Sequence, residues 1–480
     1  MILKRDILVG LFIFFLVTST NTYAVDKEVS LDAESEECLT IKGIITHVPP
    51  DSSSDIHLYT FYGKELSKIE STRVNDRGEF VFKLMDTPKQ GLYKIGLDKQ
   101  NSATIVLSQT GDLLIKADYR LLQADKIIVV NSRENNAYRK LLKVWNQMQK
   151  KMVKIDYLKN SLSHKDPFIM QKRNVIDENI RRLIQDYNVD LLTIKGDYPK
   201  TFTSEVLINL SFLPQLADHE QLEKTYDSEQ AFLHDYFFEF IDFSDDRIIR
   251  TPFLAEKYST YLAQFTDHTP ERLKDSVDMI LNKAVRNSTV HDFTIEFLIN
   301  LFSKRGLAEL ENYIIDNYVQ VCDKPLSERT IQMVNRLECL RVGRKAPEII
   351  LEDSEGNAIR LSSSIRKNKV LMLYFWASWC EACKAENLHI VNIYNKFKEK
   401  GLGIYGVALD FDKNEWVSAI KDYQLPWTNV SDLKQWDSEI VKVYNVNQTP
   451  TIYLVDNKGI ITAKNLRGNT LENKLKELLN

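Results

Sequence analysis

Hydrophobic and polar positions follow three different patterns along the chain. Between about residues 38 and 133, short β-rich runs recur at intervals of about ten residues, and turn signals such as Asn75-Asp76-Arg77-Gly78 separate them. Short strands at this spacing predict an all-β, sandwich-like domain, with an open barrel as the alternative. The runs include Leu39–Ile45, Ile56–Tyr62, Phe80–Phe82, Leu92–Ile95, Thr104–Leu107 and Leu113–Ile115.

Residues 134–340 instead place apolar side chains at steps of three and four, which is the period of an α-helix. One such series begins at Tyr138 and a second at Ile169, so we expect a helical hairpin with its break near Pro167. The aromatic segment 236–243 is expected to form a buried helix face or a contact between domains. The alternative is an exposed apolar surface that docks a client polypeptide.

Residues 341–480 alternate between strand and helix patterns. The apolar runs Val370–Trp376, Gly403–Asp410 and Thr451–Asp456 are typical of buried strands. Because helical patterns separate these runs, the sequence predicts an α/β domain. A linker at residues 343–347 is expected to join it to the preceding helices.

Length and composition indicate a folded protein of several domains. A chain of 480 residues is too long for a single hydrophobic core. Hydrophobic residues make up 44% of the chain and charged residues 27%, with a formal net charge of -4 and no long basic run. Because nucleic-acid binding needs a concentrated positive face, no nucleic-acid partner is expected. These features do not determine the oligomeric state.

The N-terminal residues have the pattern of an export signal. Lys4 and Arg5 precede an apolar stretch of eleven residues, Ile7–Val17, and a polar stretch then ends at Ala24. We expect a signal peptide at residues 1–24, cleaved after Ala24, and a mature protein in the periplasm or cell envelope. The alternative is an uncleaved N-terminal membrane anchor, although the stretch is short against the roughly 18 residues that a membrane span requires.

Two of the five cysteines form a C-x-x-C motif, Cys380-Glu381-Ala382-Cys383, where the strand pattern gives way to a helix pattern. Unpaired N–H groups at a helix start stabilise a thiolate, which is the form that attacks a disulfide. We therefore assign Cys380 as the attacking sulfur and Cys383, one turn further along, as the resolving sulfur. This motif predicts exchange between thiols and disulfides.

Zinc binding is the alternative for any C-x-x-C motif, but a closed zinc site needs four ligands. The sequence has no second C-x-x-C and no H-x-x-x-H motif, so neither a metal nor a cofactor is expected. Cys322 and Cys339 can form a disulfide or remain two unpaired thiols, because sequence does not determine the distance between them. Cys38 is expected to have no role in the chemistry.

Two further positions are candidates for the site. Glu386 follows Cys383 by three residues, so it shares that side of the predicted helix, and its carboxyl can exchange a proton with the sulfur. The alternative is an ordinary exposed glutamate.

Pro450 follows Thr449 and precedes a strand. A cis bond here turns the Thr449 backbone toward the sulfurs, where it can pair with an extended substrate. The alternative is a trans proline at a strand start.

Together these motifs resemble a known family. Residues 341–480 resemble the exported thiol-disulfide oxidoreductases of the TlpA/ResA type, within the thioredoxin superfamily. The matching positions are Phe375–Cys383, Glu386, Gly406-Val407 followed by Asp410, and Thr449-Pro450-Thr451 with Val455-Asp456-Asn457-Lys458-Gly459.

The resemblance implies a thioredoxin fold with a cis peptide bond before Pro450. It also implies client binding by Trp379, Thr449 and Pro450, and it supports proton transfer by Glu386, since the ResA-like branch has a glutamate there. Cytoplasmic thioredoxins have a buried aspartate where Tyr374 stands in this chain.

The N-terminal region carries a weaker resemblance. Residues 38–133 resemble a small β-domain, DUF4369, that precedes such modules in Bacteroidetes proteins. Asn131–Asn135, together with Ala137-Tyr138, matches the junction usually seen after it. This resemblance implies no activity.

The TlpA/ResA resemblance implies reduction of disulfides in envelope proteins, with disulfide-containing clients and a membrane-borne electron donor as partners. Strong oxidants of this fold carry a histidine between their cysteines, whereas Glu381 and Ala382 do not stabilise a thiolate, so a reducing pair is expected. One alternative is a non-catalytic envelope binding or scaffold protein that uses the β and helical regions. The other is a thiol peroxidase, although peroxidases of this superfamily have a threonine where Ala377 stands.

Overall fold

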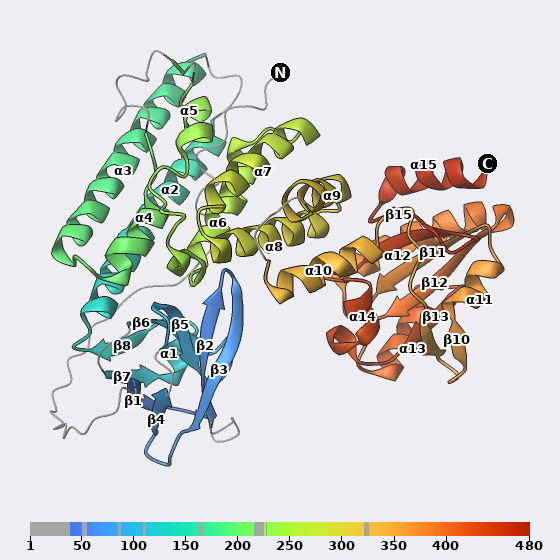
Figure 1. The fold of residues 1–480 in the computed structure, drawn as a ribbon, viewed down its shortest axis with the longest axis horizontal. Helices are drawn as coiled ribbons and strands as arrows, with labels where there is room; N and C mark the ends of the chain where they lie inside the picture. Colours follow the sequence, from blue (N-terminus) through green and yellow to red (C-terminus); the bar gives the residue numbers. More distant parts are fainter. Residues whose placement is uncertain are drawn as a thin grey trace. The chain divides into compact units, whose positions relative to one another are not determined.

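The computed structural model of the chain describes residues 39–49, 55–84, 88–108, 112–162, 167–215, 225–226, 228–320 and 326–480. The chain divides into two compact units, residues 1–294 and 295–480, and each is described by itself (Figure 1). The expected signal peptide at residues 1–24, and Cys38 and Cys322, lie outside the described residues. Within the described part of the chain, none of the helices combines the length and apolar character needed to cross a bilayer.

The described strands of the first unit form two four-stranded sheets, with strand orders β4-β1-β7-β8 and β3-β2-β5-β6. Side chains from both sheets, such as Ile41, Leu58 and Ile105, join one hydrophobic cluster and are almost fully buried. The predicted all-β, sandwich-like region is therefore confirmed. The strands are β1 (Leu39–Thr46), β2 (Asp55–Tyr62), β3 (Glu65–Arg73), β4 (Glu79–Leu84), β5 (Gly91–Gly96), β6 (Ser102–Leu107), β7 (Leu113–Asp118) and β8 (Ile127–Val130).

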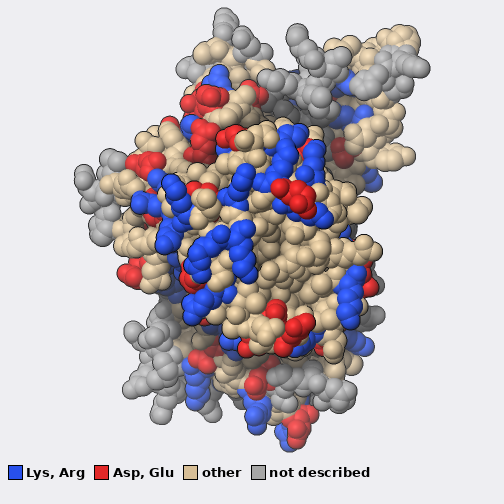
Figure 2. Space-filling view, turned by 90° about the vertical axis from the view of Figure 1, so that its right-hand side faces the viewer, with Lys and Arg blue, Asp and Glu red and all other residues tan. Residues whose placement is uncertain are grey.

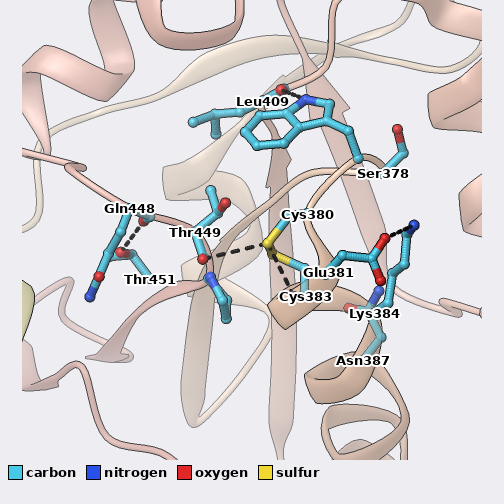
Figure 3. Close-up of a disulfide and its surroundings, with 12 residues drawn as sticks. Ser378, Cys380, Glu381, Cys383, Lys384, Asn387, Leu409, Gln448, Thr449 and Thr451 are labelled. Atoms are coloured by element: carbon cyan, nitrogen blue, oxygen red, sulfur yellow. Dashed lines mark hydrogen bonds and ion pairs between the residues drawn. A yellow bond between two sulfur atoms is a disulfide. The ribbon is translucent and has the colours of Figure 1, made fainter. Parts of the chain in front are cut away.

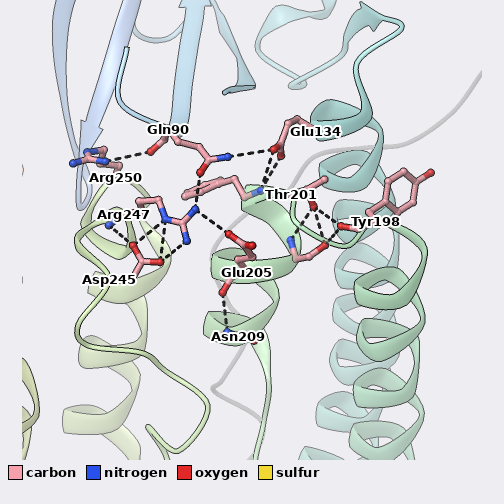
Figure 4. A network of polar contacts seen from close by, with 11 residues as sticks. Gln90, Glu134, Tyr198, Thr201, Glu205, Asn209, Asp245, Arg247 and Arg250 are labelled. Carbon is pink, nitrogen blue, oxygen red and sulfur yellow. Dashed lines mark hydrogen bonds and ion pairs between the residues drawn. The ribbon is translucent and has the colours of Figure 1, made fainter. Parts of the chain in front are cut away.

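The junction after these sheets attaches them to the first long helix. The Asn135 side chain accepts a hydrogen bond from the Val106 N–H and donates one to the Val106 carbonyl, both at 2.9 Å, so it pairs with β6 as a neighbouring strand would. Glu134 accepts hydrogen bonds from the Phe202 N–H and the Gln90 amide (Figure 4). Burial raises the pKa of Glu134. The half-buried Glu134 and the buried Asn135 therefore bind the β region to the helices.

Helices form the rest of the first unit, and the predicted hairpin is confirmed as α2 against α3. The boundary between the two units lies within α8, so residues 295–304 of this helix belong to the second unit. Residues 163–166, at the expected break, are outside the described part. The helices are α1 (Tyr119–Leu122), α2 (Arg133–Asn160), α3 (Ile169–Asp197), α4 (Ile208–Ser211), α5 (Glu229–Tyr236), α6 (Phe253–Thr260), α7 (Pro270–Ala284) and α8 (Ser288–Lys304), with single turns of other helix types at Thr203–Leu207, Asp246–Ile249 and Tyr261–Phe265.

The aromatic segment 236–243 is buried, as expected, but it is not a helix face. Helix α5 ends at Tyr236, and the following residues form turns. Phe237, Phe238 and Phe243 are at most 2% exposed and pack against other rings of this unit. Phe240 is the exposed ring of this segment, at 39%, and it lies against the Phe212 ring, so the apolar surface left here for a client polypeptide is small.

This aromatic core encloses a lysine. The Lys257 ammonium donates a hydrogen bond to the Phe212 carbonyl at 2.7 Å and lies 4.6 Å from the Phe237 ring centre. Burial lowers the pKa of Lys257 to about 7. In the unfolded chain this lysine has the ordinary pKa of about 10.4. Between pH 7 and pH 10, the unfolded chain therefore holds a proton on Lys257 that the folded chain has lost. The charged form destabilises the fold most below pH 7, and this cost disappears as the pH rises toward 10.

We predict that Lys257→Met raises the thermal unfolding temperature, because it removes a buried charge. The gain should be largest at pH 6, where Lys257 of the folded chain carries its charge, and should shrink at pH 9, where the buried amine is neutral. Scanning calorimetry of the full chain at the two pH values measures it. Exposed Lys42 provides the control as Lys42→Met. A gain that does not depend on pH would contradict the assignment.

The second unit contains one seven-stranded sheet of order β10-β9-β13-β12-β11-β14-β15. Strand β11 lies parallel to β12 and antiparallel to β14, and every residue of β11 and β12 is buried. The predicted α/β region is confirmed. The strands are β9 (Ile350–Asp353), β10 (Ala358–Arg360), β11 (Val370–Trp376), β12 (Leu402–Ala408), β13 (Thr428–Ser431), β14 (Thr451–Asp456) and β15 (Ile461–Lys464).

Helices surround this sheet, and α12 contacts α15. On the face shown in Figure 2, groups of Lys and Arg side chains lie among Asp and Glu side chains and uncharged surface, so this face is not uniformly basic. The helices are α9 (Ala308–Ile314), α10 (Glu328–Cys339), α11 (Leu361–Arg366), α12 (Glu381–Phe397), α13 (Lys413–Asp422), α14 (Glu439–Val443) and α15 (Gly468–Leu479), with short turns of other helix types at Ile315–Val319, Lys398–Lys400 and Gln435–Asp437.

Candidate active site

The two cysteines of the C-x-x-C motif lie at the start of α12, directly after β11, and form a disulfide. Cys380 is the N-cap residue, with φ -87° and ψ 108°, and the Cys383 N–H donates to its Sγ at 3.1 Å. Cys380 is 7% exposed and Cys383 is fully buried. In the reduced state the same N–H stabilises a thiolate on Cys380, the sulfur that solvent and a client can reach.

The sheet register brings the second predicted segment to these sulfurs. Phe375 of β11 pairs with Thr451 of β14, so the residues before Thr451 lie beside the end of β11. The Thr449-Pro450 bond is cis, as the resemblance implied. The Thr449 carbonyl oxygen lies 3.5 Å from the Cys380 Sγ (Figure 3). The Arg467 guanidinium donates to the Pro450 carbonyl, so the cis-proline loop is fixed on both sides.

The loop before the cysteines is held by the end of β12. Asp410 is 1% exposed and accepts hydrogen bonds from the Ser378 N–H and hydroxyl. Burial raises the pKa of Asp410. The Trp379 indole N–H donates to the Leu409 carbonyl at 2.9 Å. From the sequence, Asp410 was identifiable only through the family resemblance. The register in which Trp376 pairs with Ala408 explains why Asp410 meets Ser378.

Glu386 and its neighbours lie beneath the redox pair on α12. One oxygen of the half-buried Glu386 carboxyl is buried and has no hydrogen-bond partner. Tyr374 of β11 donates to the Asn387 side-chain oxygen at 2.8 Å. Its pKa is raised, first by burial and then by the negative charge of Glu386. A buried carboxyl oxygen without a partner is rare in native structures and is available to accept a proton.

Three exposed aromatic side chains lie on segments that adjoin the redox site. Trp379 and Trp436 are 42% and 41% exposed, with ring centres 6.1 Å apart. Phe411 is 74% exposed and directly follows Asp410. Trp436 and Phe411 were not predicted, because no local pattern distinguishes them from other surface aromatic residues.

Within the described residues no group of three or more His, Cys, Asp or Glu side chains could hold a metal ion. Cys339, at the end of α10, is exposed and has no disulfide partner among the described residues. Its pairing with Cys322 stays open, since Cys322 is outside the described part.

Part of this chain, including the redox pair, is similar in sequence to proteins of known activity. Residues 342–464 match the AhpC/TSA family. The thiol-disulfide oxidoreductase ResA of Bacillus thuringiensis subsp. konkukian (strain 97-27) is 33% identical over 144 residues, which cover 30% of this chain and 79% of that relative. The chain belongs to the ResA family of thiol-disulfide oxidoreductases.

A second ResA relative agrees with this membership, and a solved structure is also similar in sequence. ResA of Bacillus subtilis (strain 168) is 32% identical over 143 residues, covering 30% of this chain and 76% of the relative. The thioredoxin domain of a thiol-disulfide oxidoreductase from Bacteroides vulgatus is 34% identical, covering 29% of this chain and 99% of that one, with a TM-score of 0.28. As a member of the ResA family, the chain is a protein-disulfide oxidoreductase with disulfide-containing substrates. The similarity of residues 38–133 to DUF4369 stays a prediction.

Proposed function

We propose that this chain reduces protein disulfides by attack of the Cys380 thiolate and resolution by Cys383. The position of Cys380 supports this proposal most directly. Its sulfur caps α12, accepts a hydrogen bond from the Cys383 N–H and faces the Thr449 carbonyl. The thiolate attacks one sulfur of the client disulfide, a mixed disulfide forms, and the other client sulfur leaves as a thiolate. Trp379, Thr449 and Pro450 bind the client chain during this step.

Cys383 then attacks the Cys380 sulfur of the mixed disulfide. Its proton passes to Glu386, the second client sulfur leaves, and the chain is left with the Cys380–Cys383 disulfide. The client gains two electrons, and a dithiol donor must return two electrons to this chain.

We infer that this donor is membrane-borne and that the protein acts in the cell envelope after cleavage of residues 1–24. A mature N-terminus at Val25 would support cleavage and export, whereas retention of residues 1–24 would contradict cleavage and favour the N-terminal membrane anchor.

The redox pair is expected to be reducing. The residues between the cysteines supply no cation at the sulfur: Glu381 is an acid, 84% exposed and paired with Lys384 at 2.5 Å. A thiolate with little extra stabilisation makes the dithiol a stronger reductant. We predict a potential closer to about -270 mV than to about -120 mV. Equilibration with dithiothreitol buffers measures it, and a value above about -180 mV would contradict the prediction.

Peroxide reduction is a second candidate, because residues 342–464 match the AhpC/TSA family. Ala377, which is buried, provides only a methyl group where the peroxidases of this superfamily have a threonine. We therefore expect peroxide turnover far below disulfide turnover. Consumption of hydrogen peroxide by the reduced chain, at a rate comparable with insulin reduction, would favour the peroxidase.

A further inference from the structure

Helices that precede the family-matched region belong to the same compact unit as the active site. The unit begins at Ile295, whereas the family match begins at residue 342. The expected linker pairs with β15, the outer strand of the sheet. The Gly343 N–H donates to the Ile461 carbonyl and the Ile461 N–H donates to the Arg344 carbonyl, both at 2.8 Å. This pairing connects α10 directly to β15.

A buried ion pair holds α9 on the same strand. The Lys464 ammonium of β15 lies 2.7 Å from a carboxylate oxygen of Glu311, and the two side chains are 6% and 1% exposed. A buried charge is costly unless its partner is well placed, so this pair restricts α9 to one position on β15. Leu337 of α10 lines a small cavity together with Lys464. The helices are therefore docked on the β14–β15 side of the sheet.

The end of α8 reaches the cis-proline loop itself. Gly306, at φ +71°, ends this helix: its N–H donates to Ser303 and the Leu307 N–H donates to Phe302. Lys304 carries one of the last helix carbonyls, which need a donor from outside the helix. The Gln448 side-chain amide is this donor: its N–H donates a hydrogen bond to the Lys304 carbonyl at 2.6 Å.

Gln448 is thus held at two points. Its side chain binds α8, and its own carbonyl accepts the Thr451 hydroxyl at 2.7 Å. The next residue is Thr449, whose carbonyl faces Cys380 (Figure 3). Any rotation of the Gln448 backbone would move the Thr449 carbonyl.

We propose that Gln448 is a positioning residue through which α8–α10 fix the Thr449 backbone for pairing with an extended client chain. This inference rests on the proposed pairing of clients with Thr449. Gln448 touches neither sulfur nor client; it acts through Thr449. A change at Gln448 should therefore affect substrates that need backbone pairing and leave the sulfur chemistry unchanged.

The test uses the pre-reduced full chain in single-turnover reactions with two disulfides. Insulin presents a polypeptide backbone, whereas 5,5′-dithiobis(2-nitrobenzoate) presents none. Gln448→Glu, which removes the donor at constant size, and Gln448→Ala should each slow insulin reduction about tenfold, the effect of one hydrogen bond. Both variants should keep the wild-type rate with the small disulfide and the wild-type reduction potential. Lys396→Gln, which breaks the ion pair of the exposed Lys396 on α12 with Glu472 on α15, is the control and should change neither rate.

Equal slowing of both disulfides, or a shifted reduction potential, would overturn the inference, because Gln448 would then act on the sulfurs. Unchanged insulin rates in both variants would also overturn it. Failure of the wild-type chain to react with either disulfide would instead contradict the proposed function, so the two failures can be distinguished.

Discussion

Cys380→Ser is expected to abolish disulfide reduction, with a loss on the order of a thousandfold or more in insulin turnover, because a hydroxyl is not ionised at neutral pH. Cys383→Ala should also stop turnover, but for a different reason. Cys380 can still attack, and nothing then removes the client from it. The two variants differ only in whether a covalent complex accumulates, which separates attack from resolution.

Trapping from cell extract measures this difference. Cys383→Ala protein should carry client proteins that are released by dithiothreitol and identified by mass spectrometry, while Cys380→Ser and the double variant carry none. Equal recovery of partners on all three variants would show that binding does not need the attacking sulfur. Full rescue of deletion cells by Cys380→Ser would favour the scaffold alternative, in which the β and helical regions act without chemistry.

Glu386→Gln is expected to slow release of the client about a hundredfold at pH 7, the usual contribution of a general base. Glu386 is one turn beyond the buried Cys383 and has a carboxyl oxygen without a hydrogen-bond partner. A buried thiol is protonated at neutral pH, so resolution needs a group to accept its proton. Above about pH 8.5, the ordinary pKa of a cysteine, the thiol ionises more readily and the difference from wild type should shrink.

Stopped-flow fluorescence of a quenched, disulfide-linked peptide resolves the two steps. The first step, attack by Cys380, should be unchanged in Glu386→Gln. Glu381→Gln is the matched control, since Glu381 is an exposed acid on the same helix. A wild-type rate of release in Glu386→Gln at pH 7 would remove this residue from the mechanism.

The core of the site could be predicted from the sequence because its signals are local. The buried run Val370–Trp376 and the C-x-x-C spacing together indicate a strand followed by a helix start, and the structure has both. The burial of Phe237 and Phe238 was predicted for the same reason, but their turn conformation was not. Aromatic spacing alone does not distinguish a helix from a compact turn in which the rings fill one core.

Other features depend on pairing between distant residues. Strand β3 has mostly exposed side chains, and its position is set by pairing with β2, so no apolar alternation marks it. Ser378 meets Asp410, and Gln448 meets Lys304, only after the sheet and helices are assembled. Such contacts carry no periodic signal, and they determine how the predicted sulfurs are held.

Brief alkylation of the reduced full chain with iodoacetamide, followed by mass spectrometry, tests the central claim most directly. Cys380 should be labelled rapidly at pH 7, with a rate that titrates below about 8.5, the pKa of an ordinary cysteine, while Cys383 stays unlabelled. Equal labelling of both, preferential labelling of Cys383, or no labelling of either at neutral pH would contradict the assignment of Cys380 as the attacking sulfur.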